Sequence, residues 1–133
     1  MRISKILIVD DEPQARRVLR TALVAQGFEV NEAVSGEDAL TKLREEMPDV
    51  ILLDLRMPGM GGLEACREIR ASSRVPIIVV SARNTQAART EAFEAGADQH
   101  IAKPFGIEEL VARIRSVHRR NGATSQTPPG RRG

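Results

Sequence analysis

The feature that most limits the possible folds is the segment Val50–Asp54, in which four large apolar residues are followed by a carboxylate. An apolar run this short predicts a β-strand that is buried on both faces, as in a parallel sheet covered by helices. Asp54 then stands at the carboxyl end of a central strand. Open α/β sheets bind their ligands at this end of the strands, so Asp54 is a candidate functional residue.

Three other predicted strands are also followed or ended by polar residues. These are Asp10 and Asp11 after strand 5–9, Ser81 after strand 77–80, and Lys103 after strand 99–102. Because parallel strands end at one edge of the sheet, we expect three carboxylates, a hydroxyl and an ammonium group to converge there. Carboxylate oxygens suit Mg²⁺, and lysine suits phosphate oxygens. The pattern predicts a site for a divalent cation and a phosphoryl group. The alternative for Asp11 or Glu12 is a helix N-cap.

Strands and helical patterns alternate five times along the chain, which predicts an α/β domain with a doubly wound, five-stranded parallel sheet. Ser35 and Asp38 have the spacing of a helix cap, and Pro48 closes the same helix. From Asn121 onward Gly, Ser, Thr, Gln and Pro dominate. We therefore expect residues 1–120 to form the domain and residues 121–133 to be a disordered linker or tail.

Composition excludes several classes of protein. No apolar stretch is long enough to span a membrane, and Asp10 interrupts the first apolar run too early for a secretory signal. The single cysteine, Cys66, excludes an internal disulfide and suits a reducing cytoplasm. Four of the 20 basic residues lie in 119–133, so residues 1–118 carry 16 basic and 18 acidic residues, a balance that argues against a nucleic-acid-binding domain. Three phenylalanines are the only aromatic residues, which leaves little to stack on a flavin ring.

The lysine after the last predicted strand is followed by Pro104. A cis peptide bond at this position would direct Lys103 into the site, and X-Pro bonds permit that isomer at low cost. The alternative is an ordinary proline at a turn or helix start. The glycine-rich stretch 57–62 beside Asp54 either leaves room for a partner or is only a strand-to-helix connection.

Four stretches of the chain together resemble a known family. They are ILIVDDE, DVILLDLRMPGM, VPIIVVSAR and GADQHIAKPFGIEELVARIR. Over about residues 3–120 the chain resembles a response-regulator receiver domain, and within that family the OmpR/PhoB subfamily, most of all its KdpE type. The resemblance implies the flavodoxin-like (βα)5 receiver fold and a role in two-component signal transduction and transcription regulation.

The resemblance implies that Asp54 is the phosphoacceptor, which attacks the phosphoryl group of a phosphohistidine on a sensor histidine kinase. Ser81 and Lys103 would bind the phosphoryl oxygens. Catalysis of this kind consists of positioning and charge neutralisation. Receivers catalyse only their own phosphorylation and dephosphorylation, with no turnover of a separate substrate, so we expect the chain not to be an enzyme.

The resemblance also implies Mg²⁺ as the cofactor. Asp11 would bind the ion directly and Asp10 through a water molecule. Asp54 and the backbone carbonyl of Arg56 would complete the protein ligands.

One position departs from the family. Tyrosine or phenylalanine is usual three residues before the site lysine, and this chain has His100 there. By resemblance this side chain would act with Ser81 as a conformational switch, and a histidine would make that switch pH-sensitive. We favour the simpler interpretation that His100 is a solvent-facing residue near a sheet edge.

Members of the subfamily form homodimers on phosphorylation through the fourth helix, fifth strand and fifth helix. The matching charged residues here are Arg89, Asp98, Glu109 and Arg113. The alternative is a solvated charged face, because surface ion pairs are individually weak. Members usually continue into a winged-helix domain, so we expect contact with DNA only through a C-terminal domain absent from this chain. We expect a cytoplasmic location and no membrane partner.

Two other functions compete with the phosphoacceptor. A hydrolase with an aspartyl nucleophile needs a second acid two residues further on, and Arg56 occupies that place. A pseudo-receiver that binds a partner without being phosphorylated stays open because of His100.

Overall fold

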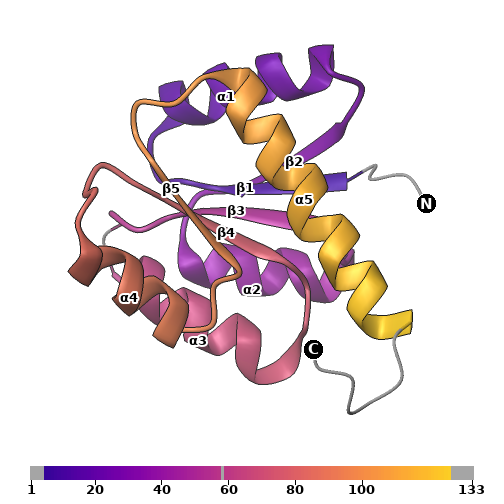
Figure 1. The fold of residues 1–133 in the computed structure, drawn as a ribbon. Helices are drawn as coiled ribbons and strands as arrows, with labels where there is room; N and C mark the ends of the chain where they lie inside the picture. The colour runs from indigo at the N-terminus through magenta and orange to yellow at the C-terminus, as the bar shows by residue number, and fades with distance from the viewer. Residues whose placement is uncertain (1–4, 58, 127–133) are drawn as a thin grey trace.

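The five strands of this chain form one parallel sheet, as seen in a computed structural model that describes residues 5–57 and 59–126 (Figure 1). Their order across the sheet is β2-β1-β3-β4-β5. The strands are β1 (Lys5–Val9), β2 (Glu29–Ala33), β3 (Val50–Asp54), β4 (Ile77–Ser81) and β5 (Gln99–Ala102). This order and the parallel pairing confirm the predicted doubly wound α/β fold.

Five helices cover the two faces of the sheet (Figure 1). They are α1 (Pro13–Ala25), α2 (Gly36–Glu45), α3 (Gly62–Ser72), α4 (Gln86–Glu94) and α5 (Ile107–Gln126). Helices α1 and α5 pack on one face and α2, α3 and α4 on the other, so each face has its own apolar core. None of these helices, within the part of the chain that the structure describes, has the length and apolar character needed to cross a bilayer.

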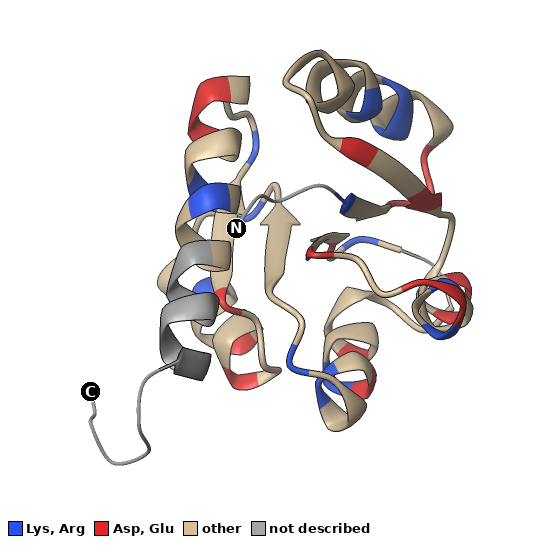
Figure 2. Ribbon diagram, turned by 90° about the vertical axis from the view of Figure 1, so that its right-hand side faces the viewer, with Lys and Arg blue, Asp and Glu red and all other residues tan. Residues whose placement is uncertain are grey.

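The central strands are buried on both faces. All five residues of β3 are buried, and alternate residues of β1 belong to opposite cores, with Leu7 in one and Ile8 in the other. Charged residues lie mostly on the helices and near the strand ends (Figure 2). After β1 the chain continues to α1 on one face of the sheet, and after β3 it continues to α3 on the other face. Open α/β sheets bind their ligands at the carboxyl ends of neighbouring strands that separate in this way.

The predicted cap of the second helix is confirmed. The Ser35 hydroxyl accepts a hydrogen bond from the backbone N–H of Asp38 at 3.0 Å, and the Asp38 carboxylate accepts one from the N–H of Val34 at 3.0 Å. Helix α2 ends at Glu45, before Pro48. The fourth helix contributes only alanines, Ala88 and Ala92, as buried residues.

The last helix runs further than the sequence indicates. Helix α5 continues to Gln126, so residues 121–126 of the predicted tail are helical. A helix that is already formed gains one hydrogen bond for each residue added, which lets it extend past its last apolar contact. The remainder of the predicted tail, 127–133, lies outside the described residues.

Gly62 lets the chain turn tightly after the central strand. A Cβ atom at this position would lie 2.4 Å from the Cα of Leu55 and 2.5 Å from the carbonyl oxygen of Asp54. Both contacts are with backbone, which cannot move aside without shifting the end of β3. The glycine is therefore required by close packing beside Asp54.

We predict that Gly62→Ala lowers the free energy of unfolding by about 2 kcal/mol, the usual cost of overpacking a rigid site. Urea denaturation measures this loss. Gly106→Ala is the matched control, because a Cβ at Gly106 would meet no atom within 4 Å. Because Gly106 precedes the first residue of α5, the control should lose only a small capping contribution, below about 1 kcal/mol. Equal unfolding midpoints for the two variants would contradict the account.

Candidate functional site

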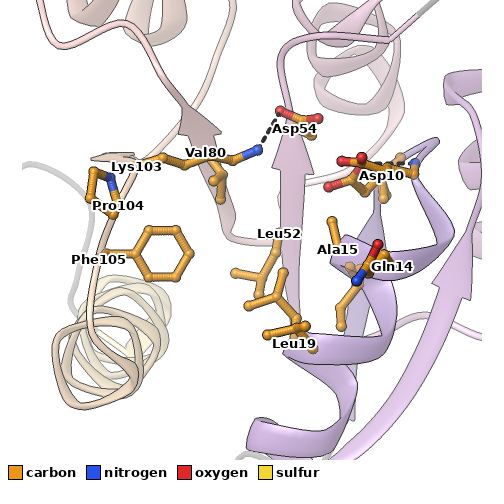
Figure 3. Close-up of a pocket in the computed structure, with 14 residues that line it drawn as sticks. Asp10, Gln14, Ala15, Leu19, Leu52, Asp54, Val80, Lys103, Pro104 and Phe105 are labelled. Carbon is orange, nitrogen blue, oxygen red and sulfur yellow. Dashed lines mark hydrogen bonds and ion pairs between the residues drawn. The ribbon is translucent and has the colours of Figure 1, made fainter.

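Three carboxylates meet at the carboxyl edge of the sheet. One oxygen each of Asp10, Asp11 and Asp54 can be chosen so that all three lie within 4.8 Å of one another. Asp10 and Asp54 are buried, while Asp11 is exposed to solvent. Figure 3 shows Asp10 and Asp54 facing each other from the ends of neighbouring strands. The convergence that the strand ends predict is therefore present in the structure.

Backbone contacts fix the position of Asp10. Its N–H donates to the carbonyl of Ala33 at 3.1 Å, and its carboxylate accepts a hydrogen bond from the N–H of Glu12 at 2.9 Å. Glu12 is the N-cap of α1, but its side chain makes no capping hydrogen bond. Glu12 therefore holds the N-cap position, as the alternative had it, but without a capping hydrogen bond from its side chain, and Asp11 is not the cap.

Asp54 sits in an unfavourable electrostatic environment. Burial raises the pKa of Asp54, and the nearby charge of Asp10 raises it further. Lys103, whose Nζ lies 3.7 Å from Oδ1 of Asp54, and the N–H of Arg56, at 3.4 Å, only partly offset this effect. Hard cations with oxygen ligands relieve such repulsion between carboxylates. The residues present therefore fit a Mg²⁺ ion.

The neighbouring strands β4 and β5 supply two further polar groups. Ser81 is buried, and its hydroxyl oxygen accepts a hydrogen bond from the N–H of Arg83 at 2.9 Å, so the hydroxyl hydrogen is left to donate elsewhere. The backbone N–H of Lys103 donates to the backbone carbonyl of Ser81 at 2.8 Å. The peptide bond between Lys103 and Pro104 is cis, which decides between the two alternatives that the sequence left open for this proline.

A largely apolar cavity of about 460 Å³ opens beside the carboxylates. It lies between α1 and the segment that joins β5 to α5, with Leu19 and Phe105 on opposite sides and Asp54 at one end (Figure 3). Val18 lines the cavity and is 62% exposed. Val18 shares its helical spacing with Leu19, Ala22 and Leu23, and spacing alone does not show that a side chain lines a cavity, so the cavity was not predicted.

The preferred interpretation of His100 is wrong. The residue is only 6% exposed, because both α4 and α5 pack against the edge strand β5. Its Nε2 has no hydrogen-bond partner among the residues that the structure describes. Burial lowers the pKa of His100, and the positive charges of Arg89 and Arg113 lower it further.

The four residues expected at a dimer interface all make contacts within this chain. Asp98 pairs with Arg70 at 2.8 Å and accepts the N–H of Ile77 at 2.9 Å. Arg113 pairs with Glu109 at 3.4 Å and donates to the carbonyl of His100 at 3.0 Å. Arg89 donates to the side chain of Asn84 at 2.8 Å. Asp98 thus fastens α3 to the sheet, whereas the other three residues lie on the α4–β5–α5 face.

The sequence of this chain is similar to those of known proteins. Residues 6–115 match the family model described as the response regulator receiver domain. The chain is 45% identical over 122 residues to the transcriptional regulatory protein ResD of Bacillus subtilis, which covers 92% of the chain and 51% of ResD. It is 44% identical to KdpE of Escherichia coli, over 96% of the chain and 56% of KdpE. The chain therefore spans about half the length of these relatives.

A solved structure supports the same likeness. The chemotaxis protein CheY4 of Vibrio cholerae superimposes with a TM-score of 0.82 at 31% identity, over 87% of this chain and 99% of that one.

We predict that the His100 imidazole titrates below its ordinary value of about 6.5. The side chain stabilises the fold fully above its unfolded-state pKa, and this contribution is lost as the pH falls through the lowered folded-state pKa. Proton NMR of the ring follows the titration. Urea denaturation should show less loss of stability in acid for His100→Phe than for the wild type. Titration at or above the ordinary value would contradict the burial of this residue.

Proposed function

This chain belongs to the response regulator receiver domain family, and we propose that it is a phosphoacceptor that receives a phosphoryl group on Asp54 from the phosphohistidine of a sensor histidine kinase. The observation that carries the proposal is the convergence of Asp10, Asp11 and Asp54 with Lys103 3.7 Å from Asp54. A surface whose only role was to bind a partner would not need to bury mutually repelling carboxylates.

The cation of this site is proposed to be Mg²⁺. Asp10, Asp11, Asp54 and the backbone carbonyl of Arg56 would hold it, with water completing its coordination. When bound, the ion supplies positive charge for the acceptor carboxylate and the phosphoryl oxygens. The raised pKa of Asp54 supports this proposal, because it indicates that the positive groups of this chain only partly neutralise the acceptor carboxylate.

The chain's own residues perform the rest of the transfer. A carboxylate oxygen of Asp54 attacks phosphorus in line, the bond to the histidine nitrogen breaks, and the imidazole leaves with the electron pair of that bond. Lys103 neutralises phosphoryl oxygens as a point charge, and the free hydroxyl hydrogen of Ser81 donates to one of them. The phosphoryl group stays on the chain, so we propose that the domain has no separate substrate and is not an enzyme in that sense.

The cavity beside Asp54 is proposed to receive a helix of the kinase. Apolar side chains on two walls, with the acceptor at one end, fit an amphipathic helix that carries the phosphohistidine. Val18 is the best exposed apolar contact on the α1 wall.

The output is proposed to be transcriptional control. The relatives are named as transcriptional regulators and are about twice as long as this chain.

We propose that phosphorylation favours a homodimer through the α4–β5–α5 face with Arg89, Asp98, Glu109 and Arg113, with His100 and Ser81 as its switch. DNA would be contacted by a segment outside this chain, in the cytoplasm. Because Arg70 and Ile77 both donate to Oδ2 of Asp98, contact of this residue with a second protomer would use Oδ1.

Phosphorylation itself gives the first test. With Mg²⁺ and a small phosphodonor, intact-mass spectrometry should show one phosphoryl adduct on the wild type and none on Asp54→Ala. No adduct should form when a chelator removes the divalent cation before the phosphodonor is added. A wild type that stays unmodified, under conditions that phosphorylate an ordinary receiver, would reject the proposal in favour of the pseudo-receiver.

The kinase-docking cavity gives a second test. We predict that Val18→Arg slows phosphotransfer from the cognate kinase about tenfold, the effect of losing roughly 1.4 kcal/mol at an interface. Its rate with a small phosphodonor should equal that of the wild type. Val24→Arg is the matched control, because Val24 is 50% exposed on the same helix but does not line the cavity. Equal slowing by the two variants would contradict docking in the cavity.

A further inference from the structure

Arg16, in the first turn of α1, connects the carboxylate site to the neighbouring strand. Its Nη1 donates to the backbone carbonyl of Asp10 at 2.8 Å, and its Nε donates to Oε1 of Glu32 at 2.9 Å. The side chain is only 13% exposed. A long charged side chain this well buried is held in one arrangement by these two contacts.

Asp10 is anchored at three points, and Arg16 supplies one of them. The N–H of Asp10 donates to Ala33 at 3.1 Å, its carboxylate accepts from Glu12 at 2.9 Å, and its carbonyl accepts from Arg16. The first two contacts hold the strand end and the side chain. Among the residues that the structure describes, it is Arg16 that holds the peptide group between Asp10 and Asp11, which sets the direction in which Asp11 leaves the strand.

Glu32 keeps the charge of Arg16 from opposing a cation. Glu32 lies in β2, one residue before its end, and its second oxygen accepts from Arg20 at 2.7 Å. Burial alone would raise the pKa of Glu32, but the hydrogen bonds from Arg20 and Arg16 outweigh burial and hold that pKa below its usual range. Glu32 is therefore ionised at neutral pH and neutralises much of the guanidinium charge beside the carboxylates.

We propose that Arg16 is a positioning residue that, by tying the Asp10 carbonyl to Glu32, sets the Asp10 and Asp11 carboxylates in place for a divalent cation. The inference deepens the function proposed above and rests on its cation site. Arg16 does not touch the cation or the phosphoryl group. Its effect is to hold the peptide between the two aspartates before the cation arrives, so that binding does not have to order it.

The expected size of the effect follows from metal sites in general. Loss of a residue that orients a ligand typically weakens metal binding by about 10-fold to 100-fold. Lysine can reach one partner but lacks the planar fork that binds two, so Arg16→Lys should recover part of the loss.

The experiment titrates Mg²⁺ into the wild type, Arg16→Ala, Arg16→Lys and Arg20→Ala, and follows the amide NMR shifts of Asp11, Asp54 and Arg56. No phosphodonor is needed. We expect Arg16→Ala to raise the dissociation constant about tenfold. Arg16→Lys should lie between it and the wild type. Arg20→Ala is the matched control, because Arg20 pairs with the same glutamate but does not contact Asp10. It should bind Mg²⁺ as the wild type does.

A second measurement separates positioning from chemistry. At saturating Mg²⁺, Arg16→Ala should be phosphorylated by a small phosphodonor at the wild-type rate, and only its half-saturating Mg²⁺ concentration should rise. A general loss of stability would not produce this split.

Several results would overturn the inference. One is a dissociation constant for Arg16→Ala equal to that of the wild type, and another is equal weakening by Arg20→Ala, which would assign the effect to charge balance at Glu32. If Arg16→Ala does not fold, a dissociation constant of Arg16→Lys equal to that of the wild type would overturn the inference instead. A wild type that binds Mg²⁺ but takes no phosphoryl group would reject the phosphoacceptor function and leave the role of Arg16 standing. A wild type that does not bind Mg²⁺ would overturn that role.

Discussion

The repulsion among Asp10, Asp11 and Asp54 is the interaction on which the rest of this structure depends. Three carboxylates with oxygens within 4.8 Å of one another oppose folding unless a positive charge balances them. The sheet can hold them there because β1 and β3 are buried between two apolar cores, and the burial of these cores stabilises the fold enough to offset the repulsion. Lys103 supplies only part of the balancing charge, and the remainder is open to a cation.

Much of the fold and the convergence of the site residues follow from local sequence. The apolar run of β3 could only be a strand buried on both faces, and parallel strands end at one edge, so Asp54, Asp10 and Ser81 had to lie near one another. The cis bond before Pro104 was one of two alternatives that the sequence left open, and the structure decides for it. These features depend on periodicity and on the order of the elements, both of which the sequence carries directly.

The features that were missed depend on contacts between elements. Arg16 and Glu32 are distant in sequence, and nothing in either segment indicates that they meet. His100 was placed in solvent because β5 lies at the sheet edge, but helices on both faces cover that edge strand. Val18 has the helical spacing of the other apolar residues of α1, yet it lines the cavity beside Asp54. Periodicity identifies an apolar face, but only the packing shows what covers it.

The most direct test of this account is the free energy of unfolding of the wild type and Asp54→Asn, measured by urea denaturation with and without Mg²⁺. If carboxylate repulsion is what the cation relieves, Asp54→Asn should be more stable than the wild type without Mg²⁺. Saturating Mg²⁺ should then stabilise the wild type, by about 2.7 kcal/mol at a concentration 100 times the dissociation constant, and stabilise the variant much less. Equal stability of the two proteins without Mg²⁺, together with an equal response to it, would contradict the account.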